Sequence, residues 1–398
     1  MKRSDHPIDI NPFYLLLSIY LFANLYSWLI LSVGLPVMVD AGEYVFEASI
    51  VFMTGVALSF SFLMIIAFYK LVLGVTKIRS ELFFLRQGAT VLLIIQLAYL
   101  VFNYYYGVNI AGVESQVDND TVLGVFFKIL QPDLLFLIVA LGMKSNRGFW
   151  LNSLVNAISL LLRGWIGGLF LLVVIVAIRR YPTPIGSKNL IWFLLLLLLG
   201  IIILPLVVSA KWFLRSGAGL DDAISFLTDF GYFNYMIDSI GYVINRFQLF
   251  GHVALLAENS NEIYTAYQDG EFIPYWMDGA PQWLLLKLNG VDIVQLNKYM
   301  VSFFFGSDNF AYATNPGIAG WLFALREKSI FFIGYLFLIT IPPSIFVLRY
   351  AGIKYFLLVM CFALIYLFHG WIGAYFNLLI YLIFFIVIKN VNFAKTSF

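Results

Sequence analysis

The segment KSNRGFWLNSLVNAISLLLRGWIGGLFLLVVIVAIRR, residues 144–180, decides the fold of this chain. Its central part, 149–178, is predominantly apolar, with basic residues at both ends and one charge, Arg163, inside it. Basic connectors of membrane proteins stay on the cytoplasmic side, so both ends of this segment belong on one side of a membrane. The central part is short for two spans of about 20 residues each. We therefore predict a helical hairpin of two short helices that turns near Leu162–Gly168.

The whole chain has the composition of a membrane protein. Of its 398 residues, 62% are hydrophobic and 12% are charged, and its mean hydropathy is +0.90. A soluble globular chain is about 45–50% apolar and about 25% charged. Lipid is therefore the expected solvent for most of this chain. We predict a lipid bilayer as its surroundings and no nucleic-acid partner.

Further apolar runs of spanning length lie on both sides of this hairpin. They are 13–38, 48–69, 88–106, 122–143, 190–208 and 329–348, with a second long block at 355–388. The second block also has basic residues at both ends, so we predict another hairpin there, with His369-Gly370 at its turn. The predicted fold class is an all-α polytopic membrane protein with about ten spanning helices, within a range of about ten to twelve.

The charges of the connectors orient these spans. One set of connectors, with both termini, holds 15 basic and three acidic residues, whereas the short opposite connectors hold six acidic residues and no base. By the positive-inside rule, both termini are then cytoplasmic. We expect a protein of the bacterial inner membrane with N-terminal helices in 1–208, a large periplasmic loop in 209–328 and C-terminal helices in 329–398.

The long loop has a mixed character. It holds 12 acidic and seven basic residues and is rich in aromatic residues, Gly, Pro and Asn. Amphipathic patterns predict helices at Asp221–Phe233, Met236–Glu258 and Ala280–Lys287. A loop this long and this apolar is expected to pack on the membrane helices as a cap. No internal repeat is evident, which argues against a secondary transporter.

Metal and cofactor chemistry have no recognisable motif in the sequence. The single cysteine, Cys361, lies in an apolar run, and His6, His252 and His369 form no cluster with metal-ligand spacing. There is no P-loop, no dinucleotide fingerprint and no G-x-S-x-G elbow. We therefore expect no metal, no cofactor and no ATP-driven motor in this chain.

Arg163 is the sharpest functional candidate, because a charge in an apolar run is costly unless it is solvated or paired. Guanidinium binds phosphate bidentately, which favours an anion site. The alternative is an arginine that snorkels to the interface. Bases also stand at both edges and in the centre of the acidic loop, as a lipid-linked diphosphate held outside the bilayer would require. The candidate diphosphate-binding residues are Arg163, Arg246, Arg215 and Arg326. Lys128 and Asp133, within the run 122–143, are expected to pair or to mark a buried polar contact.

The stretch YTAYQDGEFIPYWMDGAPQW, residues 264–283, alternates aromatic rings with carboxylates. Aromatic faces stack on sugar rings, and carboxylates accept hydrogen bonds from sugar hydroxyls. This composition indicates a carbohydrate site, although an interfacial aromatic belt has the same composition. The candidate sugar-binding residues are Tyr264, Tyr267, Asp269, Glu271, Tyr275, Trp276, Asp278 and Trp283.

Taken together, the chain resembles a Wzy-type O-antigen polymerase, a family related to the O-antigen ligases. The resemblance lies in ten or more spans, a late large periplasmic loop and Leu162-Arg163-Gly164, which is similar to a Ser-Arg-Gly step of the superfamily with Leu162 in the Ser place. Asn245-Arg246-Phe247 resembles the loop arginine of the family, and 314–326 resembles the segment before the next span. The chain departs from the Arg-x10-Gly motif, since the expected Gly is absent after Arg215, Arg246 and Arg326.

This resemblance implies a membrane glycosyltransferase of the GT-C type for lipopolysaccharide or similar polysaccharide biosynthesis. It would join undecaprenyl-diphosphate-linked oligosaccharide units at the periplasmic face, with inversion and without a metal. Arginines would stabilise the diphosphate leaving group. The candidate catalytic bases are His252, which is preferred, and Glu258. A polysaccharide chain-length regulator is an expected partner.

Other functions remain open from the sequence. The closest is an O-antigen ligase, which transfers the same glycan to lipid A-core. A polysaccharide flippase or another transporter would need no large loop and would place its functional charges deep in the spans. A structural or receptor membrane protein would not need the loop bases.

Overall fold

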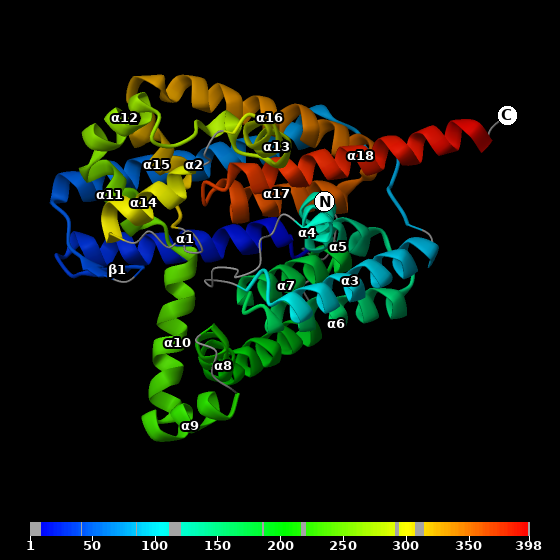
Figure 1. The fold of residues 1–398 in the computed structure, drawn as a ribbon, viewed down its shortest axis with the longest axis horizontal. Helices are drawn as coiled ribbons and strands as arrows, with labels where there is room; N and C mark the ends of the chain where they lie inside the picture. Colours follow the sequence, from blue (N-terminus) through cyan, green and yellow to red (C-terminus); the bar gives the residue numbers. More distant parts are fainter. Residues whose placement is uncertain are drawn as a thin grey trace, which may run out of the picture. The chain divides into compact units, whose positions relative to one another are not determined.

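The computed structural model describes residues 9–40, 42–84, 86–110, 121–184, 187–215, 220–290, 294–306 and 314–396. The chain forms two compact units, coloured by sequence in Figure 1. Unit 1 takes Met1–Leu15 and Phe83–Ile244, and unit 2 takes Leu16–Leu82 and Asn245–Phe398. The unit boundary at Ile244 falls inside the predicted loop, so the residues of that loop are shared between the two units.

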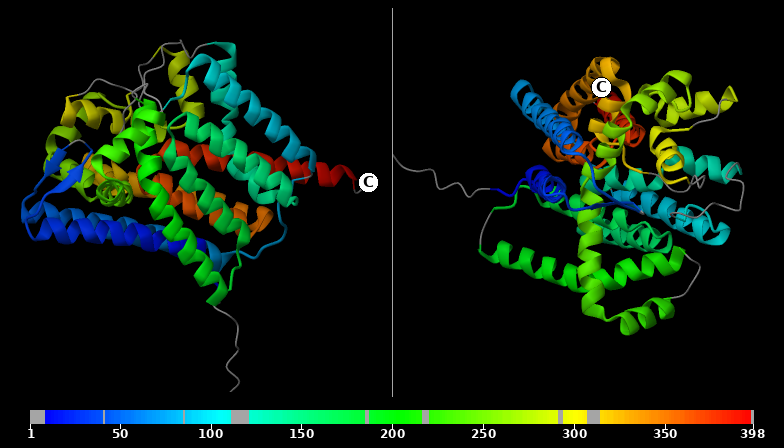
Figure 2. Two further views of the ribbon diagram at one scale, coloured as in Figure 1. Left: turned by 90° about the horizontal axis from the view of Figure 1, so that it is seen from below. Right: turned by 90° about the vertical axis from the view of Figure 1, so that its left-hand side faces the viewer.

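Unit 1 is built from helices. They are α3 (Arg86–Tyr106), α4 (Val122–Leu130), α5 (Pro132–Gly142), α6 (Asn146–Leu162), α7 (Ile166–Arg180), α8 (Ser187–Arg215), α9 (Leu220–Phe230) and most of α10 (Tyr232–Phe247). α3 packs on α5 and α6, and α6 packs on α7; the views in Figure 2 show this group in cyan to green. The predicted run 122–143 is broken at Gln131, which has a left-handed φ of 43° immediately before Pro132. Proline has no N–H to continue a helix but suits the first position of the next one.

Unit 2 combines long apolar helices with shorter ones. Its elements are most of α1 (Pro12–Ser32), β1 (Val37–Val39), β2 (Gly42–Tyr44), α2 (Ala48–Val75), α11 (Phe250–Glu258), α12 (Ser260–Asp269), η1 (Tyr275–Met277), α13 (Ala280–Leu288), α14 (Leu296–Phe305), α15 (Gly317–Leu325), η2 (Arg326–Lys328), α16 (Ser329–Ala351), α17 (Ile353–Phe362), η3 (Ala363–Leu367) and α18 (Ile372–Thr396). α2 packs against α11, α15 and α16, and α16 packs against α17 and α18. β1 and β2 form an antiparallel hairpin in which Val37 faces Tyr44.

The two long apolar blocks form helical hairpins whose turns have the same sequence pattern. LLRGWIG at 161–167 and LFHGWIG at 367–373 are identical at five of seven positions. Each turn places its first glycine at positive φ, +66° for Gly164 and +82° for Gly370. The glycine N–H and the following tryptophan N–H donate to the carbonyls of Leu161 and Leu160 in one turn and of Leu367 and Tyr366 in the other, which is the Schellman arrangement. The two turns thus share a short sequence match and the same backbone arrangement.

One predicted helix of the loop is divided in two. The expected helix Met236–Glu258 is interrupted at Gln248 and Leu249, between α10 and α11. The buried Asn24 side chain stabilises the break, since its Nδ2 donates to the Phe247 carbonyl at 3.1 Å and its Oδ1 accepts from the Leu249 N–H at 2.9 Å. Asn24, on α1, therefore satisfies the backbone groups that have no helical partner at the break. A local sequence pattern does not reveal this contact.

Six helical segments in the described part of the chain are long and apolar enough to cross a membrane. They are Pro12–Ser32, Ala48–Val75, Gln87–Tyr106, Val122–Gly142, Gly317–Ala351 and Ile372–Lys389. Leu197–Phe213 and Ile353–Leu367 are shorter apolar helices. The fold is thus consistent with a polytopic membrane protein that has about six candidate spans.

Candidate functional site

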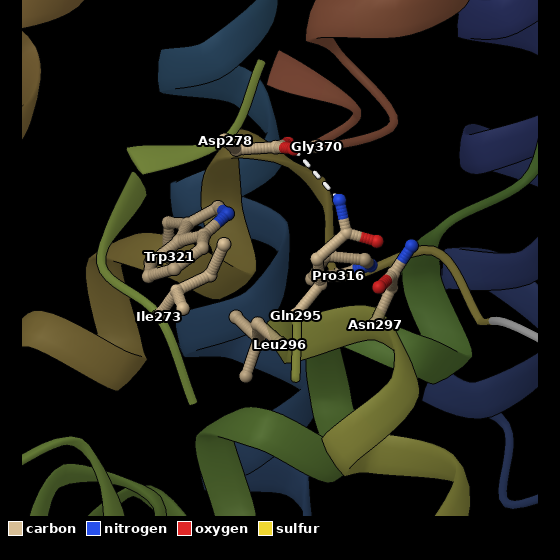
Figure 3. Close-up of a pocket in the computed structure, with 8 residues that line it drawn as sticks. All are labelled: Ile273, Asp278, Gln295, Leu296, Asn297, Pro316, Trp321 and Gly370. Carbon is tan, nitrogen blue, oxygen red and sulfur yellow. Dashed lines mark hydrogen bonds between the residues drawn. The ribbon is translucent and has the colours of Figure 1, made fainter. Parts of the chain in front are cut away.

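A small pocket lies in unit 2 where four segments meet (Figure 3). The Ile273 N–H donates to the Val294 carbonyl at 2.8 Å, which joins the segment after α12 to the start of α14. The N–H groups of Gly317 and Ile318 donate to the carbonyls of His369 and Phe368, which fixes the start of α15 on the second hairpin turn. The enclosed space is about 10 Å³, room for about one water molecule, and it opens to solvent. The lining residues are Ile273, Asp278, Gln295, Leu296, Asn297, Pro316, Trp321 and Gly370.

Asp278 is the charged residue of this pocket. Its Oδ1 accepts a hydrogen bond from Gln295 Nε2 at 2.7 Å, drawn as the dashed line in Figure 3. Its Oδ2 accepts from the Gly373 N–H at 2.8 Å, in the first turn of α18, where the helix dipole favours a negative charge. A Cβ at Gly373 would lie 2.5 Å from Asp278 Oδ1, so only glycine permits this approach. Burial raises the pKa of Asp278, and the hydrogen bonds from Gly373 and Gln295 oppose this rise.

A second hydrogen bond ties the same segments together. The Ala280 N–H, at the start of α13, donates to Asn377 Oδ1 on α18 at 2.9 Å. Asp278, which lies just before α13, therefore caps the start of α18. In return Asn377, on α18, caps the start of α13. Such caps satisfy N–H groups that have no partner inside their own helix. This exchange holds Asp278 in place at the edge of the pocket.

Two further polar atoms of pocket residues are buried without a hydrogen-bond partner among the described residues. They are Asn297 Oδ1 and Trp321 Nε1. Buried polar groups are normally satisfied, so such atoms call for an explanation, and a missing ligand or water is one. With Asp278 they give the pocket a carboxylate acceptor, an amide acceptor and an indole donor beside apolar walls. A water molecule or a single hydroxyl group of a ligand matches this set.

The predicted base His252 is also buried in unit 2, with a carboxylate beside it. Its Nε2 lies 2.8 Å from Asp40 Oδ2, and both side chains are less than a tenth exposed. A carboxylate only accepts, so in the neutral imidazole Nε2 carries the proton and Nδ1 keeps the lone pair. Nδ1 is buried and has no hydrogen-bond partner in the described part of the chain. Gly251 allows this approach, because a Cβ there would lie 2.3 Å from Val39 Cγ2 on β1.

The aromatic residues predicted to bind sugar fall into two groups. Tyr275 is buried, and its ring packs against Trp276, Trp321, Phe332 and Tyr335 at centroid distances of 4.7 to 5.9 Å. It therefore supports the wall of the pocket. Trp276 is 43% exposed.

Tyr264 and Tyr267 lie on α12 beside bases that close the predicted loop. Tyr264 donates to Glu327 Oε1 at 2.5 Å, and this hydrogen bond raises the pKa of Tyr264. The guanidinium of Arg326, a predicted diphosphate ligand, lies 5.6 Å from the Tyr264 ring, and Nη1 donates to Asn261 Oδ1. Lys328 lies over the rings of both Tyr264 and Tyr267. These residues form a cation–aromatic group, with exposed charges over half-buried rings, that is distinct from the pocket lining.

Arg163, in unit 1, is buried at the end of α6 and makes several contacts. Its Nη2 donates to both carboxylate oxygens of Asp133 at 2.9 Å, its Nη1 donates to the Tyr99 hydroxyl at 3.2 Å, and its Nε donates to the Ser159 carbonyl. The guanidinium also lies over the Tyr99 ring at 5.0 Å. The Asp133 side chain remains 39% exposed and accepts from Asn156 as well. The charge that the sequence places in an apolar run is therefore paired.

Arg246 and His252 both lie close enough to His369 to interact with it electrostatically. Arg246 is exposed near the end of α10, and Glu258 is exposed at the end of α11, whereas His252 at the other end of that helix is buried. Asp269 and Glu271 are both exposed, on either side of the end of α12. The side chains of Arg215 and Trp283 lie outside the described part of the structure. Asp278 is thus the predicted sugar-binding residue that lines the pocket.

Sequence reasoning missed several of these residues. Asp40 was counted only as an acidic connector residue, and Gln295, Asn297 and Trp321 carried no motif. They come together through backbone contacts between distant segments, for which a single sequence holds no signal. Among the described residues, no group of three or more His, Cys, Asp or Glu side chains is arranged to hold a metal ion. Comparison of the chain with models of protein families, with curated proteins and with solved structures gives no match.

Proposed function

We propose that this chain is a polymerase of lipid-linked oligosaccharide repeat units. In this proposal it lies in a bacterial inner membrane with about ten crossings, both termini are cytoplasmic, and 209–328 is periplasmic. The proposal combines the charge asymmetry of the connectors and the resemblance to O-antigen polymerases with the site chemistry of unit 2. The single structural observation that supports it is the small pocket around Asp278, because its acceptors and indole donor suit a sugar hydroxyl at its mouth.

The proposed reaction forms one glycosidic bond. A hydroxyl oxygen of the terminal sugar of one lipid-linked unit attacks the anomeric carbon of the glycan on a second unit. The bond from that carbon to the diphosphate oxygen breaks, and undecaprenyl diphosphate leaves with the electron pair. The hydroxyl proton goes to a base, for which His252 is the first candidate, since Asp40 fixes its protonation at Nε2 and leaves Nδ1 as the basic nitrogen.

Guanidinium groups would stabilise the negative charge of the leaving diphosphate. The candidates are Arg163, Arg246, Arg215 and Arg326. For Arg163, a diphosphate would have to replace or share the Asp133 carboxylate, which uses the same Nη2 donor. Exchange of one anionic partner for another keeps the buried guanidinium paired throughout, which avoids the cost of an isolated buried charge.

The test is genetic and chemical. A bacterium that lacks the gene for this chain should carry surface glycan of a single repeat unit, and the intact gene should restore the ladder of longer chains on gel electrophoresis. Loss of all surface glycan, single units included, would instead indicate a ligase or a flippase. A reporter fused at Asp269 should be active only if it is an enzyme that needs the periplasm; activity of a cytoplasmic reporter there would overturn the topology.

A further inference from the structure

We infer that the cation–aromatic group of unit 2 binds the phosphate of an anionic phospholipid at the membrane surface. Arg326 and Lys328 contact the phosphate, and the first turns of α16 contact the acyl chains. The inference does not rest on the proposed function. Of the four arginines proposed for the diphosphate, it takes Arg326 and leaves the other three as candidates. It follows from the way the two cations are held, from their charge balance and from the apolar surface that begins beside them.

Both cations are held in place by uncharged groups. Arg326 Nη1 donates to Asn261 Oδ1 at 2.8 Å, and the guanidinium lies 5.6 Å from the centre of the Tyr264 ring. Lys328 Nζ lies 5.6 Å from the centre of the same ring and 5.7 Å from that of Tyr267. Contacts with amides and ring faces order these side chains without neutralising their charge. Less conformational entropy is therefore lost when an anion binds to them.

The charge of the group matches one phosphodiester. Neither Arg326 nor Lys328 forms an ion pair with a carboxylate in the described part of the chain. Glu327 stands between them in sequence, but its Oε1 accepts a hydrogen bond from the Tyr264 hydroxyl. Two bases and one acid leave residues 326–328 with a net charge of +1. A phosphodiester carries one negative charge, whereas a diphosphate carries more and is repelled more strongly by Glu327.

An apolar surface begins directly after Lys328. Ile330, Phe331 and Leu338 on α16 are 64%, 71% and 70% exposed, and a Cβ added at Gly334 would meet nothing within 4 Å. Positions 331, 334 and 338 share one face of the helix. The helix belongs to a segment that is long and apolar enough to cross a membrane, so acyl chains suit this face. The cations at its start then lie at the level of the headgroups, where basic side chains meet lipid phosphates.

Arg326 also has an unusual backbone conformation. Its φ is +49° and its ψ is −120°, at the junction of α15 and η2, a combination that residues other than glycine rarely adopt. Such a conformation costs free energy and persists only where the surrounding structure imposes it, which is common at binding sites. This junction is where the chain brings Arg326 and Lys328 beside the rings of α12.

The experiment compares lipids that differ in the charge of the headgroup. The purified full-length chain in a neutral detergent is titrated with dioctanoyl phosphatidylglycerol and with dioctanoyl phosphatidylcholine, and bound lipid is counted by native mass spectrometry. The tightest site should prefer phosphatidylglycerol by about tenfold or more, the ratio that corresponds to about 1.4 kcal/mol. Glycerol phosphate, which has no acyl chains, should bind this site about tenfold or more weakly than phosphatidylglycerol does.

Three variants locate the site. The double variant Arg326→Gln, Lys328→Gln should lose the tight phosphatidylglycerol site. Glu327→Gln removes the acid of the group and keeps an oxygen for Tyr264, so it should tighten binding by about threefold, as expected for one exposed charge. Arg147→Gln removes an exposed positive charge on α6 and should leave the site unchanged. Poor folding cannot produce a gain in affinity, so Glu327→Gln keeps the test decisive.

Any of four results would overturn the inference. They are equal affinity for phosphatidylcholine or glycerol phosphate, unchanged binding by the double variant, unchanged binding by Glu327→Gln, and displacement of phosphatidylglycerol by a tenfold lower concentration of farnesyl diphosphate. The last result would assign the group to the diphosphate carrier, as the proposed function has it for Arg326. Failure of polymerisation in cells would reject the proposed function and leave these titrations standing.

Discussion

Arg163 and His369 occupy the same position in the same type of turn, one in each compact unit. Each residue is the last before a glycine at positive φ, and each is followed by Gly-Trp-Ile-Gly. Their side chains nevertheless have different surroundings. Arg163 pairs with Asp133, whereas His369 Nε2 is buried with no hydrogen-bond partner among the described residues. The two turns thus share their backbone arrangement, whereas the side chains at the two apices have different surroundings.

The ion pair of the first turn should be important for stability. Asp133→Ala leaves the buried Arg163 guanidinium without its carboxylate, and loss of one partner of a buried pair costs about 3–5 kcal/mol. The lower end is expected, since Asp133 is partly exposed. Thermal unfolding of the purified protein measures the loss, and the double variant Asp133→Leu, Arg163→Met should recover part of it. Equal unfolding midpoints for the unmodified chain and Asp133→Ala would contradict this account.

The diphosphate hypothesis predicts that lysine cannot replace two of the arginines. Arg163→Lys and Arg246→Lys should each shorten the surface glycan ladder while the protein still accumulates in the membrane, because lysine offers a point charge rather than a bidentate fork. Loss of a charge-assisted contact in the transition state costs about 2.7–4 kcal/mol, or about a hundred- to a thousandfold in rate. A ladder of normal length from either variant would make that arginine an anchor or a structural residue.

Asp40 should act through His252. Asp40→Asn keeps a residue type that tolerates the left-handed φ of 49° at this position, but the amide no longer fixes the proton of His252 on Nε2. We expect kcat of polymerisation to fall by tenfold or more, of the order expected for a misplaced general base, with little change in KM. Parallel measurement of His252→Gln gives the comparison: if Asp40→Asn loses activity while His252→Gln keeps it, Asp40 does not work through the imidazole.

Gly370 should tolerate no side chain. Its φ is +82°, and a Cβ there would lie 2.8 Å from the Gly317 nitrogen. A left-handed residue costs about 1–2 kcal/mol, so Gly370→Ala should lower the free energy of unfolding by about 2 kcal/mol or more once this backbone contact is included. Gly334→Ala is the matched control on α16, where nothing lies within 4 Å of the added Cβ. A neutral Gly370→Ala would show that the second turn adopts another conformation.

Stability should depend on pH through Asp278. Burial raises its pKa in the folded chain above the usual value of 3.8, so the folded state holds the proton more tightly than the unfolded chain does. The stabilisation this provides is complete below the unfolded pKa and is lost as pH rises through the folded pKa. The unmodified chain should therefore lose stability relative to Asp278→Asn as pH rises above about 4. A difference in unfolding midpoints that does not vary with pH would refute this.

The hairpins illustrate what sequence reasoning can predict. Basic flanks and the length of each apolar block indicated two helices with a turn at Leu162–Gly168 and at His369-Gly370, and helix breaks lie there. The sequence also shows that GWIG follows both apex residues, a match too short to indicate a repeat of whole spans.

The site was harder to predict for a physical reason. Asp278 stood out because it lies among aromatic residues, but its partners Gln295 and Gly373 reach it only through the tertiary fold. Asp40 belongs to a tight strand turn, and its contact with His252 depends on how closely α11 approaches β1. A sequence pattern reports the periodicity of one segment at a time, so it carries little information about contacts between segments that are distant in sequence.

The hydrogen bond from Gly373 to Asp278 connects the pocket to a membrane-length helix. Asp278 caps the first turn of α18, and α18 contains the apolar segment Ile372–Lys389. A ligand that draws the carboxylate away from Gly373 removes that cap, which in helices is worth about 0.5–2 kcal/mol. Thermodynamic coupling is reciprocal, so any strain that frays the start of α18 changes ligand affinity by the same factor. Through this one contact, the order of the first turn of a helix of membrane-spanning length and the position of the Asp278 carboxylate depend on each other.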